Sequence, residues 1–82
     1  MNMPPAKAFT RFDVRPLLAK GEEPFPKIFA RVRALSTGEG LLVIAPFLPS
    51  PLIERLASEG FASKVEPGGA GEWRVYFWPE TE

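Results

Sequence analysis

The sequence predicts a single α+β domain that folds as a two-layer α/β sandwich with the element order β-α-β-α-β-β. Three observations predict this class: an amphipathic helical stretch at 21–35, a continuously apolar stretch at 41–45 and an alternating stretch at 72–78. A strand, a helix and a buried strand in succession form a βαβ unit, so we expect the first two strands to be parallel. Right-handed crossovers then place two helices on one face of a mixed four-stranded sheet and leave its other face open. The whole chain, 1–82, is assigned to this domain, with its core at about 9–78.

The first strand is expected over residues 9–14, after a loose tail at 1–7. Pro16 is expected to end this strand, and residues 17–23 are expected to form a loop. Side chains alternate along the strand, with Thr10, Phe12 and Val14 on one face and Arg11, Asp13 and Arg15 on the other. This alternation is typical of a half-buried strand.

The first helix has an apolar face whose members recur at helical spacing: Phe25, Ile28, Phe29, Val32 and Leu35. The residue before a proline avoids the α region, so Pro26 is expected at the first helical position, with Phe25 outside the helix. Phe25 has no side-chain acceptor, so the first amides need water, Glu22, Glu23 or a ligand as partner. We therefore expect one of these carboxylates, or a small anion, at the helix start, where three amides point outward: those of Lys27, Ile28 and Phe29.

The second half of the chain supplies a second helix and a hairpin. Ser50 is expected as the N-cap of that helix with Pro51 at its first position, and Gly60 as the residue that follows its last turn. Two strands are then expected at 61–66 and 72–78, and the short Gly-rich turn between them makes them antiparallel.

The last strand has two distinct faces, with Trp73, Val75 and Phe77 on one and Arg74, Tyr76 and Trp78 on the other. The first set suits the core. The second set, Arg74, Tyr76 and Trp78, supplies the interface candidates, because two large aromatic side chains on an open sheet face mark a contact surface. The alternative is that long neighbours such as Arg74 and Lys64 cover the aromatic rings. If the rings are exposed, we expect a protein partner or a weak homodimer to bind through this face.

Composition excludes several kinds of site. The sequence has no cysteine and no histidine, which rules out disulfides, thiolate catalysis and the commonest transition-metal ligand. The first 35 residues hold seven Lys or Arg against three Asp or Glu, and the remainder hold three against seven. Two solvated faces of opposite charge are the interpretation we favour, and an anionic partner is the alternative. Nucleic-acid binding through the basic first half is a third hypothesis, and the net charge of zero argues against it.

A cytoplasmic location is expected, since the sequence shows no targeting signal and no membrane-spanning stretch.

Five short motifs occur in the order and at the spacing that a known family of small domains shows. They are FDVRPL at 12–17, EPFP at 23–26, TGEGLLVIAP at 37–46, PLIERLASEGF at 51–61 and GEWRVYF at 71–77. With them the sequence resembles the bacterial domain-of-unknown-function family 2249, which belongs to the TusA/SirA-like superfamily of small sulfur-carrier domains. The resemblance implies the strand order 1-2-4-3, with the fourth strand antiparallel to the others.

Sulfur carriers of this superfamily place a cysteine in a Cys-Pro-X-Pro motif at the start of the first helix, where the helix terminus stabilises a thiolate. Here Glu23 stands in the place of that cysteine, followed by Pro24, Phe25 and Pro26, so persulfide chemistry is excluded. Members of family 2249 often carry histidines near the first helix and after the second strand, and no metal or haem role transfers to a chain without them. Because the cysteine and histidines of these relatives are missing, our leading hypothesis is a non-catalytic binding or protein-interaction module without catalytic residues, metal or cofactor.

The candidate ligand or partner contacts gather near the first helix start: Arg15, Lys20, Glu22, Glu23, Pro24, Pro26 and Phe47. An enzyme, or an enzyme partner, that uses Glu23 as a general base beside Arg15 is the alternative function. Arg15 either forms a local ion pair with Asp13, which we favour, or recognises an anion. Phe47 and Leu48, in the proline-bracketed loop 46–49, either line a pocket or, as we favour, fill the edge of the core.

Overall fold

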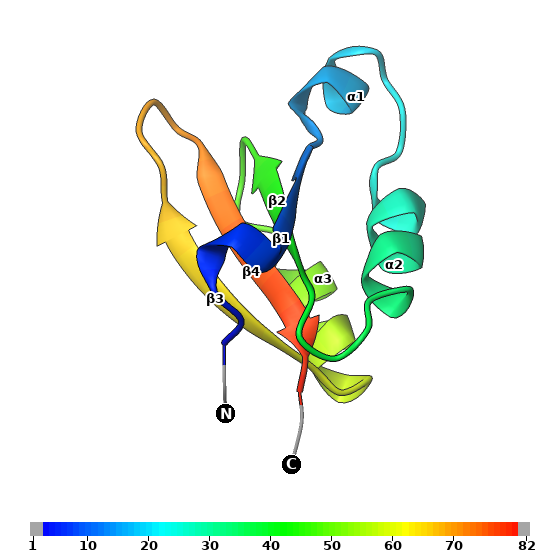
Figure 1. Ribbon diagram of the computed structural model, residues 1–82. Coiled ribbons are helices and arrows are strands. Elements are labelled where there is room, and N and C mark those ends of the chain that lie inside the picture. The colour runs from blue at the N-terminus through cyan, green and yellow to red at the C-terminus, as the bar shows by residue number, and fades with distance from the viewer. Residues whose placement is uncertain (1–2, 81–82) are drawn as a thin grey trace.

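Residues 3–80 are described by the computed structural model, in which four strands and three α-helices form a two-layer sandwich (Figure 1). The strands are β1 (Phe9–Asp13), β2 (Gly40–Ala45), β3 (Phe61–Pro67) and β4 (Trp73–Pro79). The helices are α1 (Arg15–Ala19), α2 (Phe25–Arg33) and α3 (Ser50–Ser58), and a 3₁₀ turn, η1 (Ala6–Ala8), precedes β1.

The sheet has the strand order β1-β2-β4-β3, which confirms the order implied by the family resemblance. β1 and β2 are parallel, as the βαβ pattern predicted. β4 runs antiparallel to both of its neighbours, β2 and β3. The expected strand positions are therefore confirmed, with boundaries that differ by a residue at several ends.

The hydrophobic core lies between the sheet and the two longer helices, α2 and α3, which lie on one side of the sheet in Figure 1. Alternate residues of the central strands face it: Leu41, Val43 and Ala45 from β2, and Val75 and Phe77 from β4. The helices contribute Ile28, Val32, Leu52 and Leu56. Burial of each valine, leucine, isoleucine or phenylalanine side chain in this core stabilises the fold by about 1.5–3 kcal/mol.

Two short elements were not expected from the sequence. Residues 15–19, assigned to the end of a strand and a loop, form α1, and residues 6–8 of the expected loose tail form η1. In α1, Pro16 is the second residue, where its missing amide hydrogen would have no helical partner in any case. Pro16 therefore ends the strand as predicted but also begins a helical turn.

Both longer helices begin one residue earlier than predicted. In α2, Phe25 is the first helical residue and Pro26 the second, and the Ile28 amide donates to the Pro24 carbonyl at 3.0 Å. In α3, Ser50 lies inside the helix rather than at its N-cap, and Pro49 holds the cap position. A proline at the second position is tolerated because that amide would also be unpaired. Gly60, with φ of 94°, follows the last turn of α3, as predicted.

The face of the sheet opposite α2 and α3 is built from rows of paired residues that change from charged to aromatic along the strands. The row nearest the carboxyl ends of β1 and β2 contains Asp13, Ile44, Arg74 and Glu66. The next row contains Arg11, Leu42, Tyr76 and Lys64. At the other end Phe9 pairs with Gly40, and Trp78 pairs with Ala62.

Phe9 closes the aromatic end of this face. Its ring makes edge-to-face contacts with Tyr76, at 5.2 Å between centroids, and with Trp78, at 6.2 Å. Trp78 is only 4% exposed and Tyr76 is half-buried. The expectation of two exposed aromatic rings is therefore wrong for Trp78, because a residue of its own chain packs against it.

Candidate functional site

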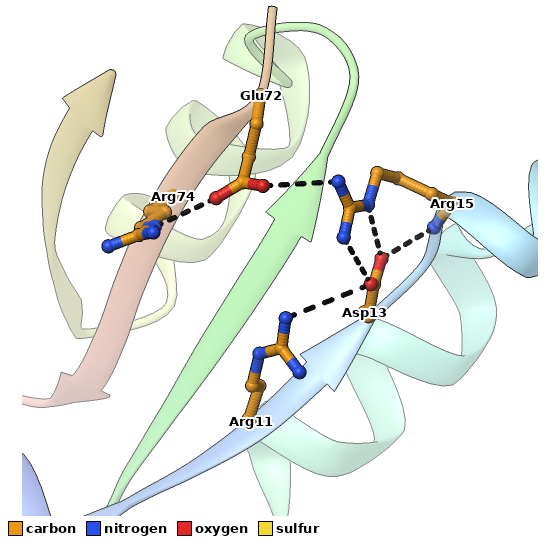
Figure 2. A network of polar contacts seen from close by, with 5 residues as sticks. All are labelled: Arg11, Asp13, Arg15, Glu72 and Arg74. Carbon is orange, nitrogen blue, oxygen red and sulfur yellow. Dashed lines mark hydrogen bonds and ion pairs between the residues drawn. The ribbon is translucent and has the colours of Figure 1, made fainter. Parts of the chain in front are cut away.

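A network of charged side chains lies on this second face, at the carboxyl end of β1 (Figure 2). The guanidinium group of Arg15 donates two hydrogen bonds to the Asp13 carboxylate, from Nε to Oδ1 at 2.9 Å and from Nη2 to Oδ2 at 2.7 Å. Its backbone amide also donates to Asp13 Oδ1 at 3.0 Å. The local ion pair favoured for these two residues is confirmed, with the bidentate geometry that makes Arg–carboxylate pairs strong.

The network continues across β2 to Glu72, which precedes β4, and to Arg74 in β4. Arg15 Nη1 donates to Glu72 Oε1 at 3.1 Å, and Arg74 Nε donates to Glu72 Oε2 at 2.8 Å. Figure 2 shows the Arg15–Glu72 contact passing over β2, which lies between β1 and β4 in the sheet. Beneath it Ile44, which pairs with both Asp13 and Arg74, is 2% exposed although it lies on the face opposite α2 and α3. The charged network thus shields an apolar residue from water.

Local backbone geometry positions the two carboxylates. The Val14 amide donates to the Ile44 carbonyl, which extends the β1–β2 ladder, and the chain then turns into α1 with Arg15 as its first residue. On the other side, Glu72 closes the β3–β4 turn through two backbone hydrogen bonds with Gly68 and Gly69. Both carboxylates are therefore held by turns at the same end of the sheet, where β1 ends and β4 begins.

The charges of the network stabilise one another. The pKa of the Asp13 carboxyl is lowered chiefly by its hydrogen bonds from Arg15, and the pKa of Glu72 chiefly by its hydrogen bond from Arg74. The same contacts raise the pKa of both guanidinium groups. A general base needs a pKa raised toward neutrality, and the shifts of these two carboxylates go in the opposite direction.

Within residues 3–80 no hydrogen bond or ion pair joins Arg15 to Glu22 or Glu23 at the start of α2, because Arg15 binds Asp13 and Glu72 instead. Glu22 forms an ion pair with Lys27, at 3.5 Å from Oε1 to Nζ. Within residues 3–80 neither Glu22 nor Glu23 accepts a hydrogen bond from a backbone amide of α2, and no side chain caps this helix. The expectation of three outward amides is wrong for Ile28, whose amide is bonded to Pro24. Lys20 and Pro26 are exposed, and Pro24 is buried.

The loop after β2 differs from the interpretation we favoured. Phe47 is 41% exposed and Leu48 is 40% exposed, so neither fills the edge of the core. Pro49, which follows them, is buried and ties the loop to the domain. Residues 3–80 enclose no pocket, so the two side chains form part of an open surface.

Three members of this site were not among the residues predicted from the sequence: Arg11, Asp13 as a carboxylate bridging two arginines, and Glu72. Alternation had placed Arg11, Asp13 and Arg15 on one side of the first strand, so this signal was present. Glu72 lies far from them in sequence. Only the sheet order and register bring it to Arg15.

The family model for Uncharacterized conserved protein (DUF2249) matches residues 11–79. The chain belongs to this family. The matched range contains every residue of the charged network, whereas Phe9 and η1 lie before it. No curated protein and no solved structure matches the chain.

Two further observations concern the DUF2249 domain as a whole. Within residues 3–80, no three acidic side chains gather in a group that could hold a metal ion. Over the same range, no helix has both the length and the hydrophobicity that crossing a bilayer requires.

Proposed function

We propose that this DUF2249 domain is a non-catalytic protein-interaction module that binds its partner at the end of the sheet where β1 and β2 finish. One observation carries the proposal: Phe47 and Leu48 stand adjacent and about two-fifths exposed on the loop that leaves β2. Single exposed apolar residues are common on protein surfaces, but a pair at this end of the sheet is informative, because open α/β sheets bind their ligands there.

The stiffness of the loop supports the proposal. Pro46 and Pro49 bracket the two apolar residues, and Pro51 follows in the first turn of α3. Prolines restrict the free loop, so little conformational entropy is lost when a partner orders it. A stiff loop with two apolar side chains is suited to docking against a complementary surface.

The absence of the carrier cysteine supports a non-catalytic role. We infer that the domain belongs to the TusA/SirA-like superfamily, an inference supported by the sheet order that the resemblance implied. At the position where those carriers hold a cysteine, this chain has Glu23. The rival enzyme hypothesis requires Arg15 beside Glu23, and Arg15 instead binds Asp13 and Glu72.

The test is affinity capture from an extract of the native host. The wild-type domain is compared with the double variant Phe47→Ser, Leu48→Ser, and with Val65→Ser, which alters an exposed apolar residue of β3 outside the loop sequence. We expect a protein that is retained by the wild type and by Val65→Ser but lost with the double variant. An identical set of captured proteins for all three, with circular dichroism showing that each is folded, would contradict the proposal.

A further inference from the structure

The charged network is layered, with carboxylates beneath and guanidinium groups outside. The Asp13 and Glu72 side chains are 24% and 16% exposed, whereas those of Arg11, Arg15 and Arg74 are 63%, 42% and 47% exposed. We call Arg11, Arg15 and Arg74 the guanidinium layer. A partner that approaches this end of the face therefore meets three cations before it meets two anions.

Much of the hydrogen-bonding capacity of this layer is unused. A guanidinium group carries five N–H donors. Arg74 uses only Nε, so both of its terminal amino groups lack a hydrogen bond within residues 3–80. Arg11 approaches Asp13 only to 4.0 Å and makes no hydrogen bond in the same range. These donors can bind an external acceptor without breaking the internal network.

The internal network also holds part of the layer in place. All three guanidinium nitrogens of Arg15 bind carboxylate oxygens, and Arg74 is fixed through Nε. A long side chain that is already ordered loses less rotational freedom on binding, which strengthens an interface. The underlying carboxylates therefore act as supports for the arginines as well as neutralising them.

We infer that the guanidinium layer binds the carboxylate side chains of an acidic segment in the protein partner. The inference rests on the proposed interaction function and specifies the chemistry of the partner. Planar carboxylates match the forked donors of arginine. A flat surface without a pocket suits a peptide segment better than an enclosed small molecule.

Charge favours a short acidic segment over a nucleic-acid backbone. The layer is interleaved with Asp13 and Glu72, and Glu66 pairs with Arg74 across the β3–β4 ladder. Continuous phosphates would pass close to these carboxylates, and the whole chain has no net positive charge to offset the repulsion. Individual acidic side chains can instead be placed at Arg11 and Arg74 while avoiding the anions.

The probe is a fluorescent peptide of alternating glutamate and glycine, compared by anisotropy at low salt with its lysine counterpart and with an oligothymidylate of equal charge. The wild type is compared with Arg11→Gln, with the double variant Arg11→Gln, Arg74→Gln, and with Arg55→Gln as control. Arg55 lies in α3 and stacks over Phe29, so its loss changes the charge as much as Arg11→Gln does but leaves this face intact.

We expect the glutamate peptide to bind the wild type and Arg55→Gln alike, and the double variant to bind it about fivefold to tenfold more weakly. Arg11→Gln alone should show part of this loss, and because Arg11 makes no hydrogen bond within residues 3–80, this variant should fold normally. Equal binding by all variants, no binding by the wild type, or tighter binding of the oligothymidylate would overturn the inference.

The outcome can be separated from that of the capture experiment. A partner that depends on Phe47 and Leu48 but is indifferent to Arg11 and Arg74 would preserve the interaction function and remove its acidic chemistry. Peptide binding that depends on the arginines, without any captured partner, would leave the guanidinium layer as a binding surface and contradict the proposed role of Phe47 and Leu48.

Discussion

Gly40 is where a single missing side chain makes room for another. It pairs with Phe9 across β1 and β2, and a Cβ built on Gly40 would overlap the Phe9 ring. Gly40 does not have a positive φ, so its backbone would accept any residue. The glycine is required because Phe9 crosses it to reach Tyr76 and Trp78.

Gly40→Ala should therefore destabilise the domain by about 1–3 kcal/mol, since the Phe9 ring must move from its contacts. In the Phe9→Ala background the same substitution should cost nothing, and the lower entropy of the unfolded chain can even make it favourable. Urea denaturation of the wild type, the two single variants and the double variant gives this cycle. A cost for Gly40→Ala that is unchanged when Phe9 is absent would show that the clash has another source.

Asp13 should contribute to the dependence of stability on pH. Its pKa is lower in the folded chain, chiefly because of the hydrogen bonds from Arg15, so its contribution is fully present above the unfolded pKa of about 4. The contribution should be lost as pH falls from there through the folded pKa. Asp13→Asn should have a shallower loss in this acid range and should cost about 1 kcal/mol at neutral pH.

The measurement is the unfolding free energy in urea across the acid range. Glu54→Gln is the control, because Glu54 is exposed on α3 and forms no ion pair within residues 3–80. Acid slopes that are identical in the wild type and Asp13→Asn would exclude Asp13 as a source of the pH dependence.

At the scale of elements, the sequence predicted the strands and helices that show a periodic pattern of apolar residues. It missed the short helix α1, which has too few residues to show one. The strands and the two longer helices follow from alternation and from apolar stripes, and their positions are confirmed. α1 was missed because five residues are too few to show a helical period, and because Pro16 also marks the end of a strand. The order of the strands came from the resemblance, since no local pattern specifies which strand lies in the middle of a sheet.

The starts of the helices show where local rules compete. Ser50 before Pro51 fits an N-cap by residue type, yet Ser50 is already helical and its hydroxyl makes no hydrogen bond within residues 3–80. The Ile53 amide donates to the Pro49 carbonyl instead, at 3.1 Å. Pro49 is buried, so packing of the loop against the domain has shifted the helix start by one residue.

Ser50→Ala therefore tests the observed helix start. A serine that caps a helix costs about 1 kcal/mol when replaced by alanine. Because Ser50 does not cap α3, we expect its replacement to change the unfolding free energy by less than about 0.5 kcal/mol. Thermal and urea denaturation should agree on this, and a loss near the capping value would favour the N-cap that the sequence indicated.

At the scale of the whole molecule, the basic first part of the chain is joined to the acidic second part. Arg15 binds Glu72 on the face that α2 and α3 leave free, and Arg33 of α2 binds Glu59 after α3 with hydrogen bonds of 2.9 and 2.8 Å. The charge asymmetry of the sequence is thus partly balanced inside the fold. The sequence could not show this, because the partners are distant in the chain and meet only when the layers pack.

The two faces of the sheet are protected by different means. Helices cover one, while the other is shielded by the charged network at one end and by Phe9, Tyr76 and Trp78 at the other. Alternation placed Tyr76 and Trp78 on this face correctly. It could not show that Phe9, at the start of a neighbouring strand, would cover them. Trp78 Nε1 is buried without a hydrogen-bond partner within residues 3–80, so this packing is dominated by apolar contact.

The shielding of Trp78 by Phe9 gives a prediction for the intact domain. In a Trp73→Phe background, which leaves Trp78 as the only tryptophan, emission should be blue-shifted and resistant to acrylamide because the indole is 4% exposed. Adding Phe9→Ala should shift the emission to the red, increase quenching and cost about 2 kcal/mol of stability. Phe47→Ala is the control, since it removes an exposed aromatic ring at the other end of the domain.

Sedimentation of the same variants extends this prediction to assembly. If Phe9 keeps the aromatic end of the face from contacting other chains, the wild type should remain monomeric at high concentration and Phe9→Ala should self-associate, because it exposes a large apolar ring. Easy quenching of Trp78 in the Trp73→Phe variant would show that this face is open in solution. Self-association of the wild type that Phe9→Ala does not strengthen would show that the assembly surface lies elsewhere.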